Sequence, residues 1–231
     1  MPVALITGGS RGFGRALALD LASDGWDLVI DGRDRVALQQ VADHLTSMGT
    51  HVVAVAGDVV DPVHRAALIG AAVGFGSLDL LVNNASTLGP TPLPRIGSYP
   101  LDGLRQVYEV NVFAPLALLQ AALPHLRRSH GTAVCLSSDA GTEAYDTWGG
   151  YGSSKAALDQ LHAVLAVEEP LLHVYQFDPG DMRTAMHQAA FPGEDISDRP
   201  EPESAVAPLR ALLDSGDPSG RYRAGDRMVP S

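Results

Sequence analysis

Short apolar runs rich in β-branched residues alternate along the chain with longer segments in which apolar residues recur every three or four positions. The first pattern predicts buried strands and the second predicts amphipathic helices. The expected strands are residues 3–6, 28–30, 52–55, 80–82, 133–136 and 173–177. The expected helices are residues 14–23, 36–48, 62–73, 104–126 and 151–167.

This alternation predicts an α/β fold. Each crossover between parallel strands returns over one face of the sheet, so we expect a doubly wound, Rossmann-type parallel sheet with helices on both faces. The 231 residues suit one domain, residues 1–231. Prolines and acids interrupt the pattern over residues 191–204, and we expect a mobile substrate lid around residues 181–204.

Charge and composition exclude several classes of partner. A formal charge of −11 disfavours nucleic acid and anionic membranes, which bind basic surfaces. The longest apolar stretch, residues 107–126, contains several polar side chains and does not predict a membrane span. The eight histidines lack metal-ligand spacing, so no metal is expected. The one cysteine, Cys135, predicts a buried structural thiol, and with no signal peptide recognised we expect a cytoplasmic protein.

The first expected strand leads into a glycine-rich turn and then into the first helix. The turn comprises Thr7, Gly8, Gly9, Ser10, Arg11, Gly12, Phe13 and Gly14. In this setting backbone N–H groups and a helix N-terminus bind phosphate, with glycines for the tight turn, the close approach and the packing. The turn therefore predicts a dinucleotide site, the alternative being a βα turn without a ligand.

The end of the second strand bears on the choice of cofactor. An acid there binds the adenosine ribose of NAD, whereas an arginine meets the 2′-phosphate of NADP. Gly32 occupies the acid position, and Arg33 and Arg11 can converge on a phosphate. We therefore expect NADP(H), with NAD(H) possible because Asp31 and Asp34 flank Arg33.

Two further strand ends lie on the expected cofactor side. Asp58, followed by Val59, is positioned to accept a hydrogen bond from an adenine amino group or, equally, to cap a turn. Asn84 and Ala85 follow the fourth strand, where the carboxamide would fix the loop below the cofactor. Asn84 belongs to a chain with only three asparagines.

The strongest candidate for chemistry is the group Ser138, Tyr151 and Lys155. Lys155 is the only lysine in the chain, and its four-residue spacing from Tyr151 places the ammonium beside the phenol on one helix face. A nearby cation lowers the pKa of a phenol, so Lys155 would make Tyr151 a usable acid and base. Ser138 precedes Tyr151 by thirteen residues, and Ser137 is the alternative serine.

From residue 3 to about residue 184 these motifs together resemble a classical short-chain dehydrogenase/reductase. The resemblance implies that Tyr151 transfers the proton, that Ser138 binds the substrate oxygen, and that Lys155 binds the nicotinamide ribose. It also implies a water held by Asn111 and a cofactor contact from Thr184 after Pro179 and Gly180. A homodimer or homotetramer is expected.

Some residues depart from that pattern or only suggest a role. Ser86 stands where the family pattern has glycine, and the segment 220–225 lacks the usual glycine-rich ending, which puts the assembly in doubt. Four side chains are candidates for the substrate pocket: Tyr145, Trp148, Met182 and Met186. Packing of a short helix explains Met182 and Met186 equally well. The acids around Tyr145 and Trp148, namely Asp139, Glu143 and Asp146, would disfavour a strongly anionic substrate or, equally, form a solvated rim.

We therefore expect an NADP(H)-dependent oxidoreductase that interconverts a ketone or aldehyde and an alcohol. An NAD-dependent alcohol dehydrogenase is the nearest alternative. A non-catalytic dinucleotide-binding regulator is a further one, although it would not need Asn111, Ser138, Tyr151 and Lys155 together.

Overall fold

The computed structural model describes residues 1–227, and the last four residues of the expected domain lie outside this part. Within it, seven parallel strands form one sheet in the order β3-β2-β1-β4-β5-β6-β7. The strands are β1 (Val3–Ile6), β2 (Asp27–Gly32), β3 (Val52–Ala56), β4 (Leu80–Asn83), β5 (Thr132–Leu136), β6 (His173–Asp178) and β7 (Gly220–Arg223). The helices are α1 (Gly12–Ser23), α2 (Arg35–Ser47), α3 (Pro62–Gly74), α4 (Leu101–Tyr108), α5 (Ala114–Ser129), α6 (Gly149–Glu168), α7 (Ala185–Ala190) and α8 (Val206–Ser215).

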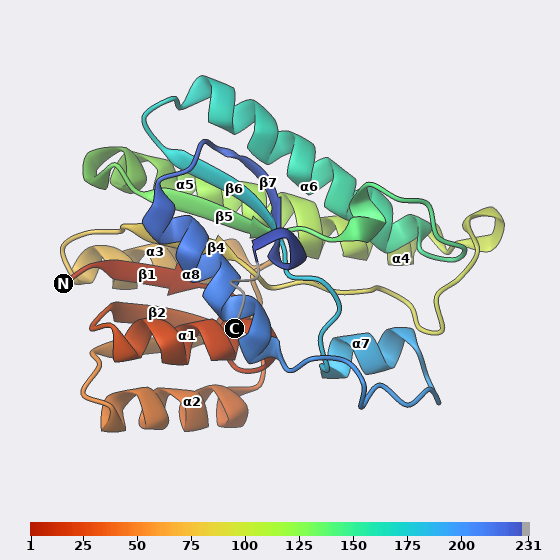
Figure 1. Ribbon diagram of the computed structural model, residues 1–231, viewed down its shortest axis with the longest axis horizontal. Helices are drawn as coiled ribbons and strands as arrows, with labels where there is room; N and C mark the ends of the chain where they lie inside the picture. Colours follow the sequence, from red (N-terminus) through yellow and green to blue (C-terminus); the bar gives the residue numbers. More distant parts are fainter. Residues whose placement is uncertain (228–231) are drawn as a thin grey trace.

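Helices cover both faces of the sheet, which confirms the predicted doubly wound fold (Figure 1). One core cluster packs α1, α2 and α8 against the sheet, and a second packs α3, α5 and α6 against the opposite face. Strand order reverses between β1 and β4. Ligands of such sheets bind at this reversal, outside the carboxyl ends of the strands.

The expected helix 104–126 is instead a continuous but irregular helical stretch. It runs through α4, a π-helical turn (Glu109–Phe113) and α5. By length and composition alone, residues 101–129 could cross a membrane. Its α5 part packs Leu118, Ala122 and Leu126 into the core of this single-domain fold, as in a core helix of a soluble protein.

Two C-terminal elements were not predicted. β7 has the sequence Gly-Arg-Tyr-Arg, which lacks the apolar run of a buried strand, yet it pairs with β6 from Tyr175 opposite Gly220 to Asp178 opposite Arg223. The helix α8 follows the proline-rich segment at which the predicted pattern ended. Leu209 and Leu212 of α8 are completely buried against α1 and the sheet.

His162 in α6 couples the fold to pH. Burial lowers the pKa of this imidazole from 6.5 to about 4. As pH falls below 6.5 the unfolded chain is protonated first, so the free energy of unfolding should decrease between pH 6.5 and 4, by on the order of 3 kcal/mol. Urea unfolding at several pH values should show a shallower decrease in His162→Gln; equal decreases would contradict this assignment.

Candidate active site

A cavity of about 680 Å³ opens at the carboxyl ends of the strands, at the reversal of strand order. Its walls are the glycine-rich turn, the ends of β2, β3 and β4, and the segment around α7. Predicted cofactor residues that line it are Gly8, Ser10, Arg11, Gly12, Phe13, Arg33, Asp58, Val59, Asn84, Ala85 and Thr184. The volume falls in the range of sites that enclose small molecules and cofactors.

The glycine-rich turn is shaped by contacts that exclude side chains. Gly8 has a φ of +68°, and a Cβ atom at Gly14 would lie 2.7 Å from the Gly8 carbonyl oxygen. Asn84 Nδ2 donates to the Thr7 carbonyl over 2.7 Å, and Thr7 Oγ1 accepts from the backbone N–H groups of Asn84 and Ala85. Through these bonds Asn84 ties the loop after β4 to the glycine-rich turn.

The end of the cavity beside β2 presents arginines. Arg33 is exposed, and Arg11 is 64% exposed and lies 3.5 Å from Asp34, which caps α2. Asp31, in contrast, is buried and uses both carboxylate oxygens: Oδ1 accepts from the Gly8 N–H over 2.6 Å, and Oδ2 lies 2.9 Å from His64 Nε2. Asp31 therefore stabilises the glycine-rich turn through its hydrogen bond with Gly8.

Asp58 makes the predicted turn and also lies in the cavity wall. Its Oδ1 accepts from the Val60 N–H over 3.0 Å, which makes a turn, and the residue also lines the cavity with Val59. The cap of α3 is Asp61.

Ser138 and Tyr151 come together as predicted. Ser138 follows β5, Tyr151 lies in the first turn of α6, and the two side chains are near enough for Ser138 to lower the pKa of the Tyr151 phenol. The Ser138 hydroxyl itself donates to Asp139 Oδ1 over 3.2 Å. Ser137, the alternative serine, points elsewhere: its hydroxyl donates to Asp159 over 2.5 Å. The geometry thus favours Ser138 as the serine that acts with Tyr151.

Burial raises the pKa of Tyr151, contrary to the expected lowering by Lys155. Hydrogen bonds from Ser138 and Ser86 lower this pKa, whereas the charges of Asp178 and Asp139 raise it. Only 9% of Tyr151 is exposed, so removal of the phenol from water outweighs the neighbouring donors. Ser86, which stands where the family pattern has glycine, also donates to Asn111 Oδ1 over 3.2 Å. Ser86 therefore links Asn111 to Tyr151.

Lys155 is 2% exposed and donates to the Leu136 carbonyl over 2.6 Å. Its Nζ lies 5.5 Å from the centre of the Tyr151 ring, which confirms the predicted shared helix face. Burial lowers the pKa of Lys155, and the neighbouring Cys135, Asp159 and Asp178 raise it. The Lys155 side chain is therefore buried and bound to a backbone carbonyl, and the acids act on it through their charge.

Asn111 lies in the π-helical turn and is buried. Its Nδ2 donates to the Thr87 carbonyl and to Ser154, while its Oδ1 accepts from the Thr87 N–H and from Ser86. A carboxamide has these four hydrogen-bonding positions, and all are used. The predicted water would therefore have to bind the backbone carbonyl of Asn111 rather than its side chain.

The segment after β6 covers Ser138, Tyr151 and Lys155. Pro179 and Gly180 form the exit turn, in which the Gly180 N–H donates to Asp178 over 3.0 Å, and Thr184 caps α7. Met186 of α7 packs with Leu88 and Trp148 around Tyr151, and Met182 and Met186 line the cavity. Ser138, Tyr151 and Lys155 therefore lie beside the cavity beneath this apolar cover and do not form its walls.

Of the four substrate-pocket candidates, Met182 and Met186 line the cavity, whereas Tyr145 and Trp148 do not. The Tyr145 hydroxyl bonds to Asp139 and Glu143 on an exposed rim. Trp148 packs against both Tyr151 and Phe191, with ring centroids 5.7 and 5.8 Å apart.

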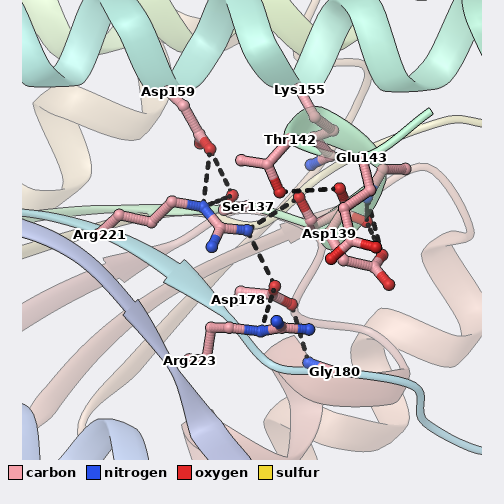
Figure 2. Close-up of polar contacts among 12 residues, drawn as sticks. Ser137, Asp139, Thr142, Glu143, Lys155, Asp159, Asp178, Gly180, Arg221 and Arg223 are labelled. Carbon is pink, nitrogen blue, oxygen red and sulfur yellow. Dashed lines mark hydrogen bonds and ion pairs between the residues drawn. The ribbon is translucent and has the colours of Figure 1, made fainter. Parts of the chain in front are cut away.

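Sequence reasoning missed the charged residues beneath α6. Arg221 of β7 lies between Asp159 of α6 and Asp178 of β6, and Figure 2 shows its guanidinium reaching both carboxylates. Arg221 and Arg223 stand two positions apart on one strand, so both reach Asp178. The alternation of arginines is a weak signal without knowledge that this segment is a strand.

The residues present suit a nicotinamide dinucleotide. The glycine-rich turn leaves no room for a Cβ atom at Gly8 and Gly14, in a setting where backbone N–H groups could meet a pyrophosphate, and exposed guanidiniums stand at the end of the cavity beside β2. Within residues 1–227, no group of three or more histidines, cysteines and acids could hold a metal ion.

Comparisons with known proteins agree with this geometry. A family model described as short chain dehydrogenase matches residues 2–195. Sepiapterin reductase from Rattus norvegicus is 34% identical over 93% of this chain and 87% of its own length.

Two solved structures resemble the whole fold. An alcohol dehydrogenase from the archaeon Thermococcus sibiricus, complexed with 5-hydroxy-NADP, has a TM-score of 0.88 and 26% identity, covering 100% of this chain and 99% of its own. A 7α-hydroxysteroid dehydrogenase complexed with NADH has a TM-score of 0.87 and 25% identity, covering 96% and 92%. This chain is therefore an oxidoreductase that belongs to the short-chain dehydrogenase family.

Proposed function

We propose that this protein is an NADP(H)-dependent reductase of ketones or aldehydes that also runs in the alcohol-oxidising direction. The observation that carries the proposal is the convergence of Ser138, Tyr151 and Lys155 beside a cavity with Arg11 and Arg33 at its far end. The names of the rat reductase and of the archaeal alcohol dehydrogenase with its NADP derivative support this direction and cofactor.

The proposed reaction adds a hydride and a proton across a carbonyl bond. The nicotinamide supplies or accepts the hydride at the substrate carbon. In reduction, Tyr151 donates its phenolic proton to the substrate oxygen while Ser138 donates a hydrogen bond to the charge that develops there. Lys155 stabilises the tyrosinate that results, which offsets the cost of burying this negative charge.

The cover around Tyr151 favours a neutral, apolar carbonyl compound. Leu88, Trp148 and Met186 provide a largely apolar environment, and Asp139 and Glu143 on the rim disfavour an anionic substrate. A screen of neutral aryl and alkyl ketones and aldehydes with NADPH tests the activity directly; the absence of any turnover would overturn the proposal.

The preference for NADPH is tested at Arg33. Replacing Arg33 with alanine should weaken NADPH binding by about tenfold or more and leave NADH binding unchanged, because one charge-assisted hydrogen bond to the 2′-phosphate is lost. Fluorescence titration or calorimetry with each cofactor measures this.

Arg35→Ala is the matched control. Arg35 is an exposed arginine at the start of α2 that does not line the cavity. Equal losses in both variants, or none in Arg33→Ala, would remove Arg33 from the site. Tighter binding of NADH than of NADPH by the unaltered protein would instead favour an NAD-dependent alcohol dehydrogenase.

We further propose a cytoplasmic homodimer or homotetramer. Exposed apolar side chains on the outer surfaces of the helical stretch 101–129 and of α6, including Phe113, Val164 and Val167, support pairing of these helices across a twofold axis.

A further inference from the structure

The last strand of the described chain contributes a charged side chain directly beneath the proposed active site. Arg221 Nη2 lies 2.9 Å from Asp178 Oδ2, and Arg221 Nε lies 3.3 Å from Asp159 Oδ2. Nε also lies 3.3 Å from the Ser137 hydroxyl. One guanidinium thereby joins the end of β5, the end of β6 and the inner face of α6 (Figure 2).

The same guanidinium holds the backbone of Ser138. Arg221 Nη2 donates to the Ser138 carbonyl over 3.0 Å, and the Ser138 side chain lies near enough to the Tyr151 phenol to lower its pKa. Ser138 lies two residues beyond the end of β5 and is not part of the strand ladder. The contact with Arg221 therefore restrains the residue that orients the phenol.

Arg221 also balances two carboxylates. The Asp178 side chain is 3% exposed and that of Asp159 is 14% exposed, and buried charges require paired partners. Arg223 lies 3.4 Å from Asp178 but is half-exposed and forms no ion pair with Asp159 in the described residues. Arg221 is thus the arginine that serves both acids.

These two acids act on the proposed catalytic pair. Both raise the pKa of Lys155, and Asp178 also raises the pKa of Tyr151. The positive charge of Arg221 opposes that influence at short range, which keeps the field at the pair smaller than two uncompensated carboxylates would produce.

We propose that Arg221 is a positioning residue, which fixes Ser138 and neutralises Asp159 and Asp178 beneath the Tyr151–Lys155 pair. The inference rests on the proposed function, which assigns the chemistry to Ser138, Tyr151 and Lys155. The charged and titratable groups that face this pair or Arg221 are Cys135 on β5, Asp139 beyond β5, Asp159 and His162 on α6, Asp178 on β6 and Arg223 on β7.

The single lysine allows a direct test that needs no substrate or cofactor. Protein labelled with ¹³C at lysine Cε gives one side-chain signal, whose pH titration reports Lys155 alone. In Arg221→Gln the uncompensated acids should raise the pKa of Lys155 by about one unit.

Arg210→Gln provides the matched control. Arg210 is also largely buried and pairs with two acids, Asp20 and Asp24, but it joins α8 to α1 away from the proposed active site. The Arg210→Gln variant should lower the melting temperature about as much as Arg221→Gln does and leave the Lys155 titration unchanged. An unchanged titration in Arg221→Gln, or equal shifts in both variants, would overturn the electrostatic role.

Arg221→Lys separates charge from geometry and serves if the glutamine variant fails to fold. It keeps the charge but cannot reach Asp159, Asp178 and the Ser138 carbonyl together. Lys155 should titrate as in the unaltered protein, while kcat for a carbonyl substrate falls about tenfold or more with NADPH affinity intact. Arg221→Lys adds a second lysine signal, which is recognised because the spectrum of the unaltered protein lacks it. An unaltered kcat would overturn the positioning of Ser138, and failure of every carbonyl substrate with the parent protein would count against the proposed function alone.

Discussion

Replacing Tyr151 with phenylalanine should reduce carbonyl turnover by a factor of about 10² to 10⁴, the usual contribution of a positioned acid or base. The change removes the proton that the proposed reaction delivers to the substrate oxygen, and it leaves the ring packed against Trp148. Steady-state kinetics with NADPH and calorimetric NADPH titration should show a loss in kcat and a nearly unchanged cofactor Kd.

Tyr108→Phe is the control for this experiment. Tyr108 ends α4 and packs against Phe113, with ring centroids 6.4 Å apart, and it does not line the cavity. Its loss of a hydroxyl should leave kcat unchanged. Turnover retained in Tyr151→Phe would remove Tyr151 from the mechanism, whereas a parallel loss of NADPH binding would indicate a folding defect.

Gly14→Ala should disrupt the dinucleotide site through a single methyl group. The added Cβ would lie 2.5 Å from Asn84 Nδ2 and 2.7 Å from the Gly8 carbonyl oxygen, where real Cβ atoms do not occur. The turn must move, so we expect about 1–3 kcal/mol of lost stability and at least about tenfold weaker NADPH binding. Urea unfolding and cofactor titration measure the two effects.

Gly70→Ala tests whether the effect belongs to the site rather than to any helical glycine. Gly70 lies inside α3, where an added Cβ meets nothing within 4 Å. Alanine favours helix there by about 0.5–1 kcal/mol, so this variant should be more stable and bind NADPH normally. If Gly14→Ala behaved like Gly70→Ala, the glycine-rich turn would not be packed as described.

Six of the strands could be predicted because each is an apolar run between turn residues. β7 could not, since its residues are largely polar and it is recognised only by its pairing with β6. The long helix 104–126 was predicted as regular because periodicity does not report a π-helical turn within a continuous apolar pattern.

In the candidate site, too, local patterns could be predicted and contacts between distant segments could not. Spacing alone placed Tyr151 and Lys155 on one face of α6, and strand ends placed Asn84 and Ser138 near the cavity. The balance of effects on the Tyr151 pKa depends on burial by Trp148 at the start of α6 and by Leu88 and Met186 from two distant segments. Likewise, Asp31 looks available for a ribose until His64, thirty-three positions away, is seen beside it.

The position of Arg221 in the chain also determines when the site can be completed. Every wall of the dinucleotide cavity is synthesised before residue 204, and the neighbours of β1 in the sheet are in place earlier still. Arg221 arrives later, on an edge strand that must dock beside β6. As the chain emerges from the ribosome, the cofactor groove can therefore form before the restraint on Ser138 exists, and docking of the final strand completes the active site.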